Sequence, residues 1–198
     1  MAAPAPGSPR PVSFALLVWL AAATAVGASG LLARSPVPPP AIAVALTILL
    51  LVALFSATSL RRRVRSLGNL VAFHIVRIAA GAWFLVLSAR GVLPGEFALV
   101  AGWGDIAVGI GAVLVWWRCF PLVSSTQRGT LLVWNALGLL DIVAVLANGA
   151  RIFLRDPAMG EPFTRLPVAL LPTFVVPLVL VSHVLIFVWG RARQQTSR

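Results

Sequence analysis

The stretch ALTILLLVALF, residues 45–55, decides the class of this protein. Its only polar side chain is Thr47, and it belongs to an apolar run over residues 40–59. A run of about 20 apolar residues matches the thickness of a bilayer core when it is helical. A strand of a membrane β-barrel would alternate apolar and polar residues, and this stretch does not. The stretch therefore predicts a transmembrane α-helix.

The composition extends this prediction to the whole chain. Of 198 residues, 60% are hydrophobic and only five are acidic, which is more apolar than a soluble core of this size could bury. Apolar runs recur at about 13–33, 40–59, 69–89, 96–117, 130–149 and 167–190. We therefore expect an all-α, polytopic bundle of six spans that forms a single transmembrane domain over residues 1–198.

The basic residues predict the orientation of these spans. The chain has 16 arginines, no lysine and a net charge of +11, but the arginines cluster in short loops, so the charge does not indicate nucleic acid as a partner. The side with both termini would carry Arg10, Arg61, Arg62, Arg63, Arg65, Arg118, Arg128, Arg191, Arg193 and Arg198. The other side would carry Arg34, Arg90, Arg151, Arg155 and Arg165. The positive-inside rule then places both termini in the cytoplasm, with Trp116, Trp117 and Trp189 at the cytoplasmic interface.

The first span has a second interpretation. Residues 1–13 followed by the apolar run FALLVWLAAATAVGASG (residues 14–30) are similar to a signal peptide with a small-residue cleavage region. The run continues into Leu31, Leu32 and Ala33, which makes it long enough to span a bilayer, so an uncleaved helix is the favoured interpretation.

Polar residues within the later spans fall on shared helix faces. At spacings of three and four residues, one face of the third span carries His74, Arg77, Gly81, Phe84 and Ser88. The fourth carries Ala98, Gly102, Asp105, Gly109 and Ala112, and the fifth Trp134, Gly138, Asp141, Val145 and Asn148. Because small residues flank Asp105, its face is expected to form a close contact between helices.

Depth predicts which charges pair. At about 1.5 Å per residue, Arg77 lies about 12 Å from the cytoplasmic end of its helix, and Asp105 and Asp141 about 17 Å from theirs. An unpaired charge at the bilayer centre costs at least about 2.5–3.5 kcal/mol, so Arg77 is expected to pair with one or both carboxylates. One arginine beside two aspartates leaves a spare carboxylate, which would hold a proton or a cation.

These residues form the candidate site, a buried polar cluster of Arg77, Asp105, Asp141, His74, Asn135 and Asn148. The leading hypothesis is a small permease or a proton- or ion-linked membrane protein, working as a homodimer because six helices are few for a transporter. The alternative is a non-catalytic structural or assembly subunit, in which the cluster only fixes helix packing. No soluble-enzyme motif is present, and we expect no catalytic residue, metal or cofactor.

The sixth span carries a helix break and a remote third hypothesis. Pro172 and Pro177 remove backbone donors, so the helix should be kinked or broken, with Thr173 placed to bond the carbonyl that Pro177 frees. The histidines His74 and His183 lie at similar depth, which permits a bis-histidine b-type haem and redox chemistry. The alternative is two histidines hydrogen-bonded within the bundle.

Three segments resemble known sequences: LPGEFALVAGWGDIAVG (residues 93–109), LVWNALGLLDIVAVL (residues 132–146) and PTFVVPLVLVSHVLIF (residues 172–187). They are similar to segments of small uncharacterised bacterial polytopic membrane proteins. The resemblance covers spans four to six and implies a multi-pass protein of the bacterial cytoplasmic (inner) membrane. It implies no catalytic residue and no substrate.

Overall fold

The computed structural model describes residues 10–57 and 66–192. Over these residues the fold is all-α, as predicted, and contains no strand. The helices are α1 (Arg10–Ala28), α2 (Leu31–Arg34), α3 (Pro39–Ser56), α5 (Leu67–Phe73), α6 (Val76–Ala89), α7 (Gly95–Cys119), α8 (Ser125–Arg155) and α9 (Val176–Ala192). A 3₁₀ helix, η1 (Pro157–Thr164), and a π-helix, η2 (Leu171–Val175), connect α8 to α9.

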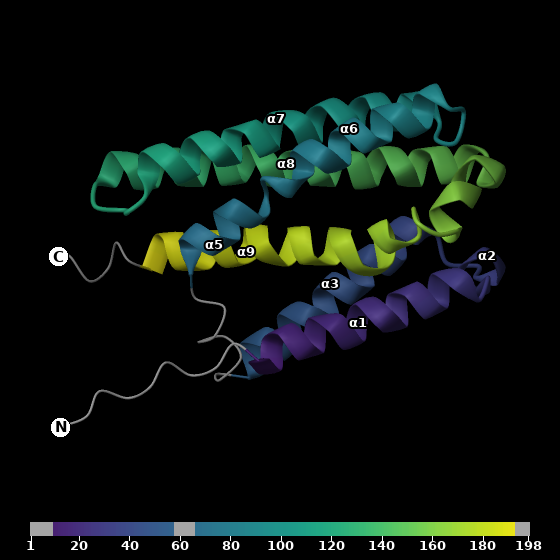
Figure 1. Cartoon of the computed structure of the whole chain (residues 1–198), viewed down its shortest axis with the longest axis horizontal. Coiled ribbons are helices and arrows are strands. Elements are labelled where there is room, and N and C mark those ends of the chain that lie inside the picture. The colour runs from purple at the N-terminus through teal and green to yellow at the C-terminus, as the bar shows by residue number, and fades with distance from the viewer. Residues whose placement is uncertain (1–9, 58–65, 193–198) are drawn as a thin grey trace.

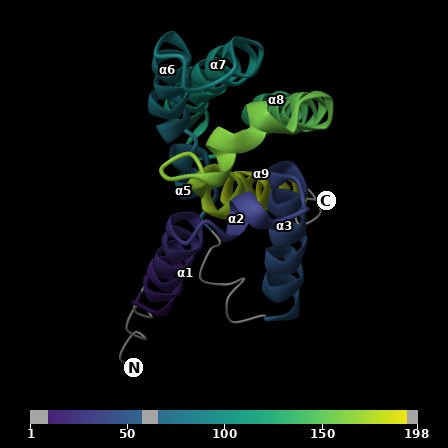
Figure 2. The same ribbon diagram turned by 90° about the vertical axis from the view of Figure 1, so that its right-hand side faces the viewer.

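The long helices run back and forth along one axis of the molecule (Figure 1). The helices α6, α7 and α8 lie together, α9 lies beneath them, and α1 and α3 lie on the far side of α9 (Figures 1 and 2). Over their most apolar windows, α9 is 61% buried but α3 only 22%. The α9 helix is therefore the centre of the bundle, and α1 and α3 form its edge.

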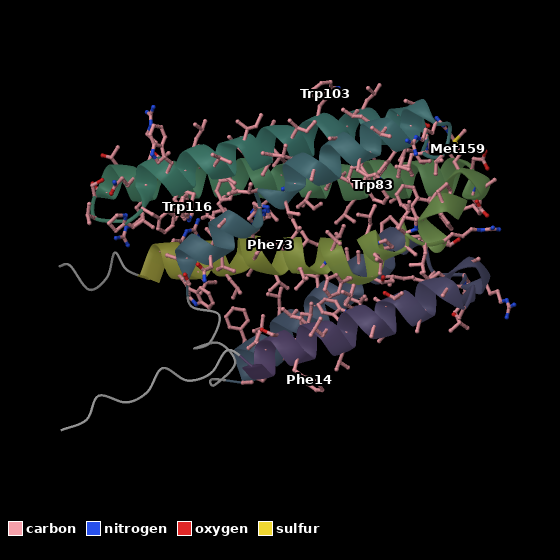
Figure 3. All side chains as sticks on the ribbon, in the orientation of Figure 1. Phe14, Phe73, Trp83, Trp103, Trp116 and Met159 are labelled. Atoms are coloured by element: carbon pink, nitrogen blue, oxygen red, sulfur yellow. The ribbon has the colours of Figure 1, made fainter. Side chains whose placement is uncertain are left out.

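Five segments are long and apolar enough to cross a membrane among the described residues: Pro39–Ser56, Leu67–Ala89, Gly95–Cys119, Ser125–Arg155 and Leu171–Arg191. Large apolar side chains cover the outer faces of the bundle, as Phe14 and Trp103 show at opposite edges of Figure 3. Phe14 is 69% exposed and Trp103 60%. Such surfaces require an apolar solvent, so this is a membrane-embedded protein.

The first predicted span differs from the helix that forms. The α1 helix ends at Ala28, and Gly30 adopts a left-handed backbone (φ 73°) before α2 begins at Leu31. The apolar part of α1, Val12–Ala28, is shorter than the five spanning segments. A left-handed residue ends a helix, so the continuous run over 13–33 divides into two pieces.

The helices of two other predicted spans also differ from the predicted bounds. The third run divides into α5 and α6 around His74 and Ile75, and α8 extends beyond the predicted 130–149 at both ends. Its start is fixed by a capping box, in which the Ser124 hydroxyl accepts from the Gln127 N–H and Gln127 Oε1 accepts from the Ser124 N–H. The cap lets α8 begin five residues before its apolar run.

The tryptophans predicted for the aromatic belt differ in their exposure. Trp116 and Trp117 are exposed, but Trp189 is 8% exposed and packs with Leu131 and Leu185 in the core. Because α9 is surrounded by other helices, Trp189 meets protein instead of an interface. The arginines on which the orientation most depends, Arg61, Arg62, Arg63 and Arg65, lie outside the described residues, as do Arg193 and Arg198.

Two apolar clusters lie at different levels of the bundle. One contains Val115, Leu131 and Leu185, and the other contains Phe97, Ile142 and Val179. Arg77 of α6, Asp105 of α7 and Asp141 of α8 come from the segments between these clusters. The site therefore forms a polar layer between two apolar ones.

Candidate functional site

Arg77 is the centre of the site and binds both aspartates. Its Nε donates to Oδ1 of Asp105 at 2.6 Å, and its Nη2 lies 2.5 Å from the same oxygen. Its Nη2 also forms an ion pair with Oδ2 of Asp141. Arg77 is 2% exposed and Asp105 6%, so their pair is shielded from solvent, whereas the Asp141 side chain is 16% exposed. The pairing that the depth argument predicts is therefore present, between α6, α7 and α8.

Tight helix crossings bring these residues together. A β-carbon at Gly81 of α6 would collide with the backbone carbonyl of Gly102 in α7, and one at Gly109 would lie 2.6 Å from Ile78. A β-carbon at Gly104 would collide with the carboxylate of Asp141. The small-residue stripe of α7 is thus a close helix contact, as predicted, and it brings the backbones near enough for short Asp side chains to reach Arg77.

The backbone just before Arg77 is also tightened. The N–H groups of His74, Ile75, Arg77 and Ile78 bond carbonyls three residues earlier instead of four. This 3₁₀-like turn separates α5 from α6 and places Arg77 in the first turn of α6. The break therefore sets the direction in which the guanidinium enters the bundle.

The charges of the central triad do not cancel. Arg77 carries one positive charge, and Asp105 and Asp141 together carry two negative charges when both are ionised. In a low-dielectric layer a net charge is costly, so the triad requires a proton or a bound monovalent cation for neutrality. This is the chemistry that the arrangement offers.

His183 of α9 joins the triad through Arg77 and is held by Asn135 of α8. Its Nδ1 lies 2.8 Å from Oδ1 of Asn135, whose Nδ2 donates to the His183 carbonyl at 3.0 Å. The amide orientation makes Oδ1 the acceptor, so the imidazole proton sits on Nδ1. The Nε2 atom is then an acceptor, and it faces Nη1 of Arg77 at 3.5 Å.

His74 lies beside His183 but bonds a different partner. The Ser182 hydroxyl donates to the Val179 carbonyl at 2.7 Å, so Nε2 of His74 donates to that hydroxyl at 3.0 Å. Nδ1 of His74 is a buried atom without a hydrogen-bond partner among the described residues. The two imidazoles therefore carry their protons on different nitrogens.

The haem hypothesis does not fit this arrangement. The ring centroids of His74 and His183 are 4.2 Å apart and tilted by 37°, so the rings contact each other directly. A porphyrin between two axial ligands needs a flat space there. Both nitrogens of His183 face Asn135 or Arg77, and Arg77 is paired with carboxylates instead of being free for a propionate.

An apolar cavity of about 80 Å³ opens beside the triad. Arg77 and Asp105 lie in its wall, and among the described residues they are the only charged ones that line it. The rest of the wall is apolar and comes from α3, α6, α7, α8, η1, η2 and α9; it includes Ala80, Phe84, Phe97, Val145, Phe163 and Val179. The charge of the triad is thus accessible from an apolar compartment.

Asn148 does not belong to the cluster, and its inclusion was wrong. It lies seven residues beyond Asp141 on α8, where its Nδ2 donates to the Glu96 carbonyl at 2.9 Å. Arg151 donates to Glu96 Oε2 at 2.7 Å, and Arg155 pairs with Oε1 of the same carboxylate. Two helical turns, about 10 Å, separate this second group from the triad.

The predicted helix break lies beside the cavity. Pro172 and Thr173 fall in the π-helix η2, and Pro177 in the first turn of α9. The Thr173 hydroxyl donates to the Ala169 carbonyl at 2.7 Å, one turn before the carbonyl that Pro177 frees. The Thr173 hydroxyl therefore bonds a carbonyl before the break. We expected it to bond the carbonyl that Pro177 frees.

Sequence reasoning missed two contributors to the site. Ser182 bonds His74, and its position beside His183 in the sequence was a usable signal. Gly104 admits the Asp141 carboxylate, but it lies off the small-residue stripe that the spacing identified, so the pattern gave no reason to select it.

Comparison with known proteins identifies a family for the chain but no activity. No curated protein and no solved structure matches it. Residues 35–190 match a family described as a domain of unknown function, DUF8737, and this match covers the site, four of the long apolar segments and all but the last residue of the fifth. An uncharacterised family is what the sequence resemblance implies. The chain belongs to the DUF8737 family.

Proposed function

We propose that this protein is a small proton-linked permease of the bacterial cytoplasmic membrane, with six spans and both termini in the cytoplasm. The observation that carries the proposal is the simultaneous pairing of Arg77 with Asp105 and Asp141 in the wall of an apolar cavity. A triad with one excess carboxylate takes up a proton and gives it back at little cost in structure, because Arg77 keeps at least one partner in both states.

The surroundings of the triad support this assignment. The titratable groups near it are His183 on α9 and His74 at the α5–α6 junction, while α3, η1 and η2 contribute only apolar residues to the cavity. A proton that leaves the carboxylates therefore has two imidazoles nearby on one side and an apolar compartment on the other. The break at η2 lies next to that compartment, and broken helices border the substrate sites of many transporters.

Proton flux into liposomes tests the proposal. Purified protein is reconstituted with a pH-sensitive dye inside the vesicles, and a potassium gradient with valinomycin supplies the driving force. We expect flux from the unaltered protein and none from Asp105→Asn or Asp141→Asn. Each variant keeps a one-to-one pair with Arg77, so both should fold. Glu161→Gln is the control, because Glu161 pairs with Arg165 at the surface, outside the triad.

A structural role for the cluster is the competing function. It is favoured by the mutual satisfaction of the three charged groups, which would equally well hold α6, α7 and α8 together. Under that role, Asp105→Asn and Asp141→Asn change stability alone, and the unaltered protein moves no protons. A well-folded protein without flux in any vesicle preparation would overturn the permease proposal.

A further inference from the structure

The cavity beside the triad has one charged end and an apolar body. Arg77 and Asp105 lie near the middle of the bundle, whereas Phe97 and Phe163 line the cavity toward η1. Asp105 and Phe97 are eight residues apart on α7, which corresponds to about 12 Å along the helix axis. The cavity is therefore elongated, and its contacts with a ligand would be almost all apolar.

The size of the cavity suits a short apolar chain. Its 80 Å³ is about half of the 150 Å³ that holds a benzene ring in an engineered protein cavity. Val76, which is 53% exposed, belongs to both the cavity wall and the outer face of α6. A compound dissolved in the lipid thus has a way in beside Val76.

The negative charge of the triad determines which polar group a ligand can carry. With both carboxylates ionised, the triad carries one negative charge, which disfavours an anion and favours a cation. The described contacts to Asp105 both fall on its Oδ1 atom, so Oδ2 remains as an acceptor for a bound donor. An ammonium group supplies both the charge and the hydrogen-bond donor.

We propose that the cavity binds a lipophilic monocation, an alkylammonium or related amine, in exchange for the proton on the triad. One proton leaves the carboxylates when one ammonium enters, and the charge of the site stays constant. This inference rests on the proposed function and names its substrate class. In the proposed permease the triad then carries either a proton or a hydrophobic ammonium, so proton flux in the liposome assay requires no amine.

Three probes with four carbon atoms each and a different charge test the ligand class. Butylammonium, butan-1-ol and butyrate are compared with purified protein in detergent micelles, and binding is measured by saturation-transfer NMR. We expect butylammonium to bind at least about tenfold more tightly than butan-1-ol, which corresponds to one charge-assisted contact, and butyrate not to bind. Butylammonium stays charged between pH 5 and 8, so its binding should weaken toward pH 5 as protons compete for the triad.

Matched variants locate the binding. Ala80 lines the cavity, and Ala82, two residues away on α6, is exposed on the outer face. Ala80→Leu should abolish butylammonium binding because it fills the cavity, and Ala82→Leu should leave binding unchanged. Asp105→Asn should remove the preference for butylammonium over butan-1-ol. Equal binding of the three probes, or binding that survives Ala80→Leu, overturns the inference.

The outcomes separate this inference from the proposed function. If proton flux in liposomes depends on Asp105 and Asp141 but butylammonium does not bind, the amine class is wrong and the permease proposal stands. If butylammonium binds as described but no flux occurs, the cavity is a cation site in a protein that is not a permease.

Discussion

The carboxylate of Asp141 rests against the backbone of Gly104, in the space that a β-carbon at residue 104 would occupy. Gly104 is the neighbour of Asp105, so the same turn of α7 supplies one aspartate and admits the other. This relationship explains how a single arginine reaches carboxylates on two different helices.

Substitution of Gly104 tests this contact. Gly104→Ala should lower the free energy of unfolding by about 1–3 kcal/mol, because the new methyl group displaces the Asp141 side chain. The measurement is unfolding in mixed micelles of increasing denaturing-detergent content. Gly129→Ala is the control, since nothing lies within 4 Å of its β-carbon position, and it should be neutral or slightly stabilising. In an Asp141→Ala background the cost of Gly104→Ala should largely vanish.

Substituting Arg77 alone should lower the free energy of unfolding more than substituting Arg77, Asp105 and Asp141 together. Arg77→Met leaves two carboxylates without a cation and should cost about 3–5 kcal/mol of unfolding free energy. Combining it with Asp105→Asn and Asp141→Asn removes the charges and should recover most of that loss. The same unfolding assay checks both variants. An Arg77→Met protein as stable as the unaltered chain would contradict the central role of the ion pairs.

The two histidines should carry their protons on different nitrogens. The hydrogen bonds place the proton of His183 on Nδ1 and that of His74 on Nε2. Nitrogen-15 chemical shifts of labelled histidine distinguish the two tautomers directly. Asn135→Leu removes the acceptor of His183 and should change the His183 signals while the His74 signals keep their pattern. Identical tautomers in the unaltered protein would show that the hydrogen-bond assignment is wrong.

The N-terminal cap of α8 should contribute measurably to the free energy of unfolding. Ser124→Ala removes the hydroxyl that accepts from Gln127 and should cost about 1 kcal/mol, together with faster hydrogen exchange in the first turn of α8. Ser125→Ala, one residue later, is the matched control because Ser125 is not the capping residue. Equal exchange rates in the two variants would argue against the capping box.

Orientation is testable with single cysteines. In a Cys119→Ser background, a cysteine at Val123, between α7 and α8, should react with an impermeant thiol reagent only from the cytoplasmic side. A cysteine at Met159, in η1, should react only from the outside. Both native positions are exposed, at 80% and 38%. The reverse pattern would invert the proposed topology.

The sequence predicted much of the fold and the centre of the site. Apolar runs identified the long helices because membrane spans leave a strong compositional signal, and the spacing around Asp105 identified its helix-facing stripe. The need to neutralise a buried arginine led to Asp105 and Asp141. These are arguments about one helix or one charge at a time.

The remaining details depend on which helices are neighbours. Trp189 lies in the core because α9 is central, and Asn148 bonds Glu96 because the end of α8 meets the start of α7. The break between α5 and α6 has no glycine or proline at His74 and Ile75 to reveal it. None of these features is visible from periodicity within a single segment.

Glu96 makes a second connection between α7 and α8. It pairs with Arg151 and Arg155 of α8, and Asp105 and Asp141 share Arg77 between two and three turns away. Attachments at two heights oppose sliding and rotation of α7 against α8, and α6 packs closely on α7. Under the proposed permease function, the inward and outward openings would alternate by a movement of these three helices against α9.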